Sequence, residues 1–259
     1  MVSANRFYRM ARQKLPIVTK EACNIFSIDN FDTEIVWMDR AEDNIEKLKE
    51  GILDYRLDTR KLIFSPKNFF RKYSKLPKLY SKFIKDFTLE HGVMCFLPHE
   101  VSHNVHDAKT DYEVGAESML IETSAYHFNN KESKILSCVC SGIKEAIVDY
   151  SGNIILERLN FKDLIDAERK LRNRAIKIAL EEDSDITIEE IPNSIDKSMK
   201  RSKHFTVYVS EVLQRKFKKE GLESFRKTAE IWRPSQVSYG NARVMLESSL
   251  VCLRHTDFQ

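Results

Sequence analysis

Two histidines and a glutamate near the middle of the chain have the types and spacing that metal chemistry requires. The stretch from Cys95 to Val105 contains the pattern H-E-x-x-H. Side chains four residues apart on a helix lie on one face, roughly 5–6 Å apart, so His99 and His103 can bind one ion together. Glu100 would then lie beside the metal, where its carboxylate can take a proton from a bound water. The pattern is typical of zinc hydrolases, which use two imidazoles, one more ligand and an open position for water.

The residues around this motif favour a buried helix with a defined start. Pro98 cannot lie inside a regular helix without breaking it, so the sequence predicts either a kink at Met94 or a fresh helix that begins at Pro98. Either arrangement places His99 in the first turn after the break. The neighbours of the histidines are uncharged, as expected for a helix in the floor of a cleft: Val101, Ser102, Asn104 and Val105.

A second pair of acidic residues supplies a candidate for the third ligand. Glu145 and Asp149 are four residues apart, separated by apolar residues, and therefore share one helix face. If Glu145 binds the ion, Asp149 can accept a hydrogen bond from the free ring nitrogen of a liganding histidine. A carboxylate in that position fixes the histidine tautomer and makes the ligand more basic.

The order H-E-x-x-H followed by E-A-x-x-D resembles the gluzincin metallopeptidases, of which thermolysin is the best-known member. The resemblance covers about residues 59–150, and 41 residues lie between His103 and Glu145. It implies that His99, His103 and Glu145 bind zinc, that Glu100 is the general base, and that Asp149 supports a histidine. It also implies an edge strand above the metal that pairs with extended substrate, for which position in the chain suggests residues 59–64.

Other acidic and histidine side chains leave some assignments open. Glu113 and Glu117 are also four residues apart and are alternatives for the third ligand, although the chain would have to reverse soon after His103. His106 shares the histidine face but lies roughly 10 Å along the helix from His99, so we expect it to pack or cap the helix end. The oxyanion donor is open among four side chains: Tyr150, Tyr126, His127 and His204.

Composition excludes several other classes of protein. The 259 residues include 42 basic and 39 acidic side chains, and a net charge of +3 predicts neither a nucleic-acid partner nor a membrane partner. We expect no signal peptide, because residues 1–7 lack an apolar run. Five cysteines form no disulfide framework, which indicates reduced thiols in a cytoplasmic protein. Cys138 and Cys140 are interpreted as buried small side chains.

Patterning along the chain predicts an α+β fold. We expect strands at 33–38 and 59–64, with Ser65 as the N-cap of a helix that begins at Pro66. The helices expected on apolar periodicity span residues 39–53, 79–105, 109–128, 132–156, 163–180 and 239–254. Ser151-Gly152-Asn153 can end or kink the fourth of these, over residues 132–156, and residues 205–209 alternate like a strand but can also start a helix.

Together with these elements, the gluzincin resemblance implies a zincin-like arrangement, with a small N-terminal sheet over an active-site helix pair and a mainly helical C-terminal lobe. We expect a metallopeptidase domain over residues 1–160 and the lobe over residues 161–259, which can belong to the same domain. The first hypothesis for function is a zinc metallopeptidase that cleaves peptide or protein substrates. A catalytically idle zinc-binding regulatory protein of the same fold, and a helical interaction module without metal, are the alternatives.

Overall fold

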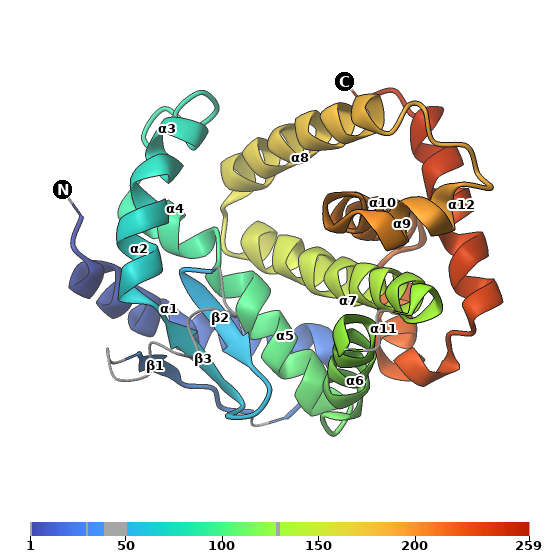
Figure 1. Ribbon diagram of the computed structural model, residues 1–259. Coiled ribbons are helices and arrows are strands. Elements are labelled where there is room, and N and C mark those ends of the chain that lie inside the picture. The colour runs from blue at the N-terminus through green and yellow to red at the C-terminus, as the bar shows by residue number, and fades with distance from the viewer. Residues whose placement is uncertain (1, 30, 39–50, 128–129, 259) are drawn as a thin grey trace. The chain divides into compact units, whose positions relative to one another are not determined.

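The protein is mostly helical, with one small sheet near its N-terminus (Figure 1). The computed structural model describes residues 2–29, 31–38, 51–127 and 130–258. The secondary structure of these residues is compatible with the expected α+β class. The chain divides into two compact units, and helices α7 (Lys131–Arg158) and α8 (Lys162–Glu182) contribute residues to both. Compact units are not domain assignments, so the expected boundary between residues 160 and 161 stays a prediction.

The first unit comprises Met1–Lys109 and Ser151–Glu168. Its complete elements, in chain order, are α1 (Ala4–Phe26), β1 (Ile35–Trp37), β2 (Leu53–Arg56), β3 (Lys61–Phe64), α2 (Pro66–Lys72), the 3-10 turn η3 (Tyr73–Lys75), α3 (Leu76–Tyr80), α4 (Leu89–Met94) and α5 (Leu97–Lys109).

Helix α1 organises the core of the first unit, and the sequence patterns used above did not predict it. Its Ser3 N-cap accepts a hydrogen bond from the backbone of Arg6, and its buried side lies along α5. The fully buried ring of Phe7 stacks on the ring of Phe64 in β3, with 5.7 Å between their centroids. It also meets the ring of Tyr73 edge-on, with 5.5 Å between the centroids. Truncating so buried a phenylalanine typically costs about 3–5 kcal/mol. The helix therefore fixes both the sheet and α5.

The sheet has the order β1-β3-β2, with β1 parallel and β2 antiparallel to the central strand. The strand expected at residues 59–64 exists as β3, but its assignment as the edge strand near the metal is wrong. β3 has a neighbour on each side, and among the described strands β2 is an edge strand that contacts α5. Strand order depends on pairing between distant segments, which position in the chain does not reveal.

The chain begins a new helix next to Pro98, close to one of the two expected arrangements. α4 ends at Met94, and α5 begins at Leu97 with Pro98 as its second residue. A proline is tolerated there because the first turn lacks intrahelical acceptors for its N–H groups. The prediction of one helix over residues 79–105 is wrong, because the chain is not helical at residues 81–88.

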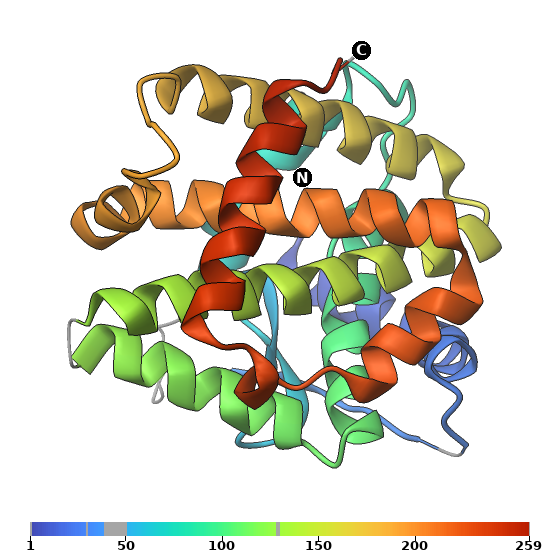
Figure 2. The same ribbon diagram turned by 90° about the vertical axis from the view of Figure 1, so that its right-hand side faces the viewer.

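The second unit comprises Thr110–Tyr150 and Arg169–Gln259. Its complete elements are α6 (Glu113–His127), α9 (Ile191–Lys197), α10 (Met199–Glu220), α11 (Leu222–Ile231), the 3-10 turn η4 (Pro234–Gln236) and α12 (Tyr239–Arg254). Helix α10 packs against α9, α11 and α12, and Figure 2 shows the terminal helix α12, in red, crossing α10, in orange.

Gly142 of α7 allows a close approach to α10. A Cβ atom at Gly142 would lie 2.9 Å from the carbonyl oxygen of Thr206, so a larger residue would force the two helices apart. Residues 205–209, for which a strand was an alternative, lie inside α10. Their burial at Phe205, Tyr208 and Val209 follows the three- and four-residue spacing of a helix.

Most other expected elements are confirmed. β1 and β3 lie within the expected strands, and α6, α7, α8 and α12 coincide with expected helices to within a few residues. The Ser65 side chain caps α2 by accepting a hydrogen bond from the backbone of Asn68. Of the helix expected over residues 39–53, residues 39–50 lie outside the described part, and Leu53 begins β2. No described helix has both the length and the apolar character needed to cross a bilayer.

Candidate metal centre

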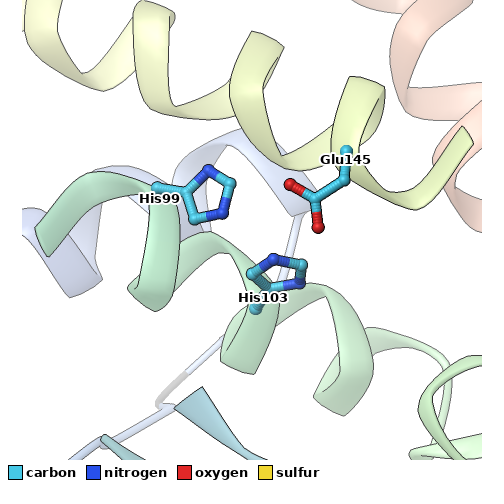
Figure 3. Close-up of side chains that lie close together, drawn as sticks. All are labelled: His99, His103 and Glu145. Atoms are coloured by element: carbon cyan, nitrogen blue, oxygen red, sulfur yellow. The ribbon is translucent and has the colours of Figure 1, made fainter. Parts of the chain in front are cut away.

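His99, His103 and Glu145 come together, as their spacing in the sequence predicts. The two histidines project from α5 and the glutamate from α7, and all three side chains are half-buried. One ligand atom from each residue lies within 4.8 Å of the other two. Figure 3 shows the two imidazole rings and the carboxylate pointing toward one another. Within the described part of the chain, no other three histidine, cysteine or acidic residues form such a group.

The arrangement fits a metal ion. An ion bound tetrahedrally at about 2.0–2.1 Å holds its ligand atoms about 3.3 Å apart. The three candidate ligand atoms lie within 4.8 Å of one another, which is close to that separation. None of the three residues is fully buried, which is compatible with a fourth ligand such as water. The group can therefore hold a metal ion.

A close approach of α5 and α7 fixes the distance between the ligand-bearing helices. The hydroxyls of Ser102 and Ser151, both buried, are hydrogen-bonded at 2.9 Å. At Gly152, an added Cβ would lie 3.6 Å from the backbone nitrogen of His99. Helix α7 runs without interruption from Lys131 to Arg158, so an end of the helix at residues 151–153 is wrong, and a kink there stays a prediction. Glu145 lies on the same helix, six residues before Ser151.

Glu100 contacts the edge strand of the sheet. One of its carboxylate oxygens, Oε2, accepts a hydrogen bond from the backbone nitrogen of Tyr55 at 2.6 Å. The Tyr55 ring is parallel to the His103 ring, with 9° between their planes and 6.4 Å between their centroids. Tyr55 was missed in the sequence. A turn at Asp58 between two short strand-like runs is a hairpin signal that could have placed it on a strand.

Asp149 accepts hydrogen bonds from side chains of the second unit. Its Oδ2 accepts hydrogen bonds from Arg172 of α8 and, at 3.1 Å, from Gln214 of α10. These bonds hold the carboxylate that shares a helix face with Glu145. The role of Asp149 in supporting a liganding histidine stays a prediction.

The alternative ligands have other contacts. Glu113 forms an ion pair with Arg233 at 3.3 Å, and Glu117 accepts hydrogen bonds from the backbone and hydroxyl of Ser235 at 2.9 and 3.0 Å. The His106 ring is fully buried, with its centroid 5.4 Å from that of Phe26. His106 therefore packs against α1, in line with its expected packing role.

The four candidates for an oxyanion donor remain open. The Tyr150 ring packs against aromatic rings of α10 and α11. Nδ1 of His204 is hydrogen-bonded to the carboxylate of Asp183 at 3.0 Å. The side chains of Tyr126 and His127 lie outside the described part of the structure. These contacts assign no donor.

Cys138 and Cys140 are buried, as expected from their positions on an apolar helix. Burial raises the pKa of each thiol to about 12. Burial also raises the pKa of Cys95. Metals bind the thiolate form, so these protonated thiols are poor ligands compared with the imidazoles and carboxylate of the group.

No protein-family model, curated protein or solved structure matches the chain. The function is therefore inferred from the geometry and chemistry of the group.

The contact at Gly152 yields a prediction about metal binding. Replacing Gly152 with Leu forces a large side chain against the His99 backbone and should weaken zinc binding by roughly tenfold or more, because ligand orientation is lost. Gly152→Ala is the matched control, since its Cβ makes an ordinary contact and should leave affinity unchanged. Competition titration with a chromogenic chelator measures both. A leucine variant that binds zinc as tightly as the alanine variant would show that this helix approach does not set the ligand geometry.

Proposed function

We propose that the protein is a zinc-dependent metallopeptidase of the gluzincin type. The observation that carries the proposal is the convergence of His99, His103 and Glu145. These residues come from two motifs separated by 41 residues, and each motif has the four-residue spacing that the chemistry requires.

The donor set supports zinc as the metal. Two imidazole nitrogens and one carboxylate oxygen form the ligand set of many catalytic zinc sites, which leave a further position open. Magnesium and calcium prefer oxygen ligands alone, so two histidines argue against them. His99, His103 and Glu145 would hold the ion, and Asp149 would support one of the histidines from the next turn of α7.

Glu100 is suited to the role of general base. When bound, zinc lowers the pKa of a water ligand to near neutrality and polarises the carbonyl of the peptide bond. Glu100 takes a proton from the attacking water and delivers it to the leaving amine as the C–N bond breaks. Glu100 directly follows His99 on α5 and lies three residues before His103, so its carboxylate can approach a water bound beside these ligands.

The sheet provides a place for an extended substrate. Among the described strands β2 is an edge strand that contacts α5, and an extended peptide can add to such an edge through main-chain hydrogen bonds to groups other than the Tyr55 N–H, which is bonded to Glu100. We propose a zincin-like arrangement in which β2, rather than residues 59–64, binds peptide or protein substrates. The buried free thiols favour a cytoplasmic location, and the balanced charge favours neither nucleic acid nor membrane as a partner.

The first test separates catalysis from metal binding. Glu100→Gln should retain one zinc per chain and lose peptide cleavage by roughly 100-fold or more, because the general base is removed while the ligands stay. His99→Ala is the control for metal and should lose zinc. Metal analysis and cleavage of a mixed peptide library provide the two readouts. A parent protein that binds zinc and cleaves no peptide would support the catalytically idle alternative.

The second test concerns Asp149. Asp149→Ala should weaken zinc binding roughly 10–100-fold if the carboxylate orients a liganding histidine. Arg172→Met is the matched control, because it breaks the ion pair with Asp149 but keeps the carboxylate. We expect it to retain zinc affinity. Equal losses in the two variants would mean that Asp149 acts only as the partner of Arg172.

A further inference from the structure

We infer that the backbone N–H of Tyr55 positions the carboxylate of Glu100 for proton transfer. The inference rests on the proposed function of Glu100 and assigns a positioning role to a residue outside both metal motifs. Its basis is the 2.6 Å hydrogen bond from the Tyr55 backbone to Glu100 Oε2.

The pairing of β2 explains why this N–H group is directed away from the sheet. Ser65 donates a backbone hydrogen bond to Ile52 at 3.0 Å, so Ile52 faces β3. In an antiparallel ladder, residues alternate between facing the partner strand and facing away from it. Tyr55 is three residues from Ile52 and therefore presents its N–H and C=O at the outer edge of β2, toward α5.

A carboxylate that acts as a base benefits from being held at one oxygen. Glu100 belongs to the first turn of α5, which fixes its backbone. Its Oε2 atom is held by the N–H of Tyr55 on β2. The second oxygen is then restricted in rotation and can be directed at the attacking water. A hydrogen bond to an ionised acceptor is stronger than one between neutral groups. The backbone donor also belongs to a paired strand, so it is more rigid than a side chain.

The N–H group and the ring of Tyr55 can be tested separately. The ring lies parallel to the His103 ring, so its loss can affect a proposed ligand. Tyr55→Ala removes the ring and keeps the N–H, whereas Tyr55→Pro removes both. Proline is tolerated in edge strands where the N–H faces away from the neighbouring strand. The difference between these two variants therefore measures the contribution of the N–H group.

Zinc-loaded Tyr55→Pro should have a kcat about 10–100-fold below that of Tyr55→Ala, with KM and zinc content unchanged. In a Glu100→Ala background the two variants should have equal residual activity, because the acceptor is gone. Circular dichroism checks that all variants are folded. Equal kcat values for the two Tyr55 variants, a higher value for the proline variant, or a proline effect that persists without Glu100 would overturn the inference.

A second readout does not depend on activity. The amide proton of Tyr55 should resonate downfield in the zinc-loaded parent protein and move upfield in Glu100→Ala. An unchanged resonance overturns the inference, even where the proline variant does not fold. A zinc-loaded parent that cleaves no peptide contradicts the proposed function, and the amide resonance then still decides whether Tyr55 holds Glu100.

Discussion

The candidate centre depends on how closely α5 and α7 approach each other. The approach is possible because three small side chains meet there: Ser102 and Ser151 share a buried hydrogen bond, and Gly152 lies against the backbone of His99. A helix is stiff over a few turns, so the contact at residues 151 and 152 also determines where Glu145 lies relative to the histidines. Two helices held apart by large side chains would separate the carboxylate from the imidazoles.

The periodicity of α5 serves packing and chemistry at once. Val101 and Val105 are fully buried and four residues apart, so they form one apolar face. His99 and His103 have the same spacing on a half-buried face. The long helix α1 lies along α5, and the edge strand β2 contacts it and donates to Glu100. The neighbours of α5 therefore bury its apolar face, and β2 also constrains the orientation of Glu100.

The sequence was informative where the physics is local. Four-residue spacing predicted that His99 and His103 share a face, and the same spacing at Glu145 pointed to α7. The Ser65 cap also depends on residues close in sequence. Strand order and the partners of side chains depend on contacts between distant segments. For that reason β2 was missed as the edge strand, together with Tyr55, and the two hydrogen-bond donors to Asp149 could not be predicted.

X-ray absorption at the zinc edge tests the central claim most directly, because it measures the ligands of the bound metal without requiring activity. For the zinc-loaded protein we predict a shell of nitrogen and oxygen atoms at about 2.0–2.1 Å, with the multiple-scattering pattern of two imidazoles. Glu145→Ala should remove one light ligand from this shell or replace it with water, and leave both imidazoles. A zinc–sulfur distance of about 2.3 Å, or fewer than two imidazoles in the parent, would contradict a centre formed by His99, His103 and Glu145.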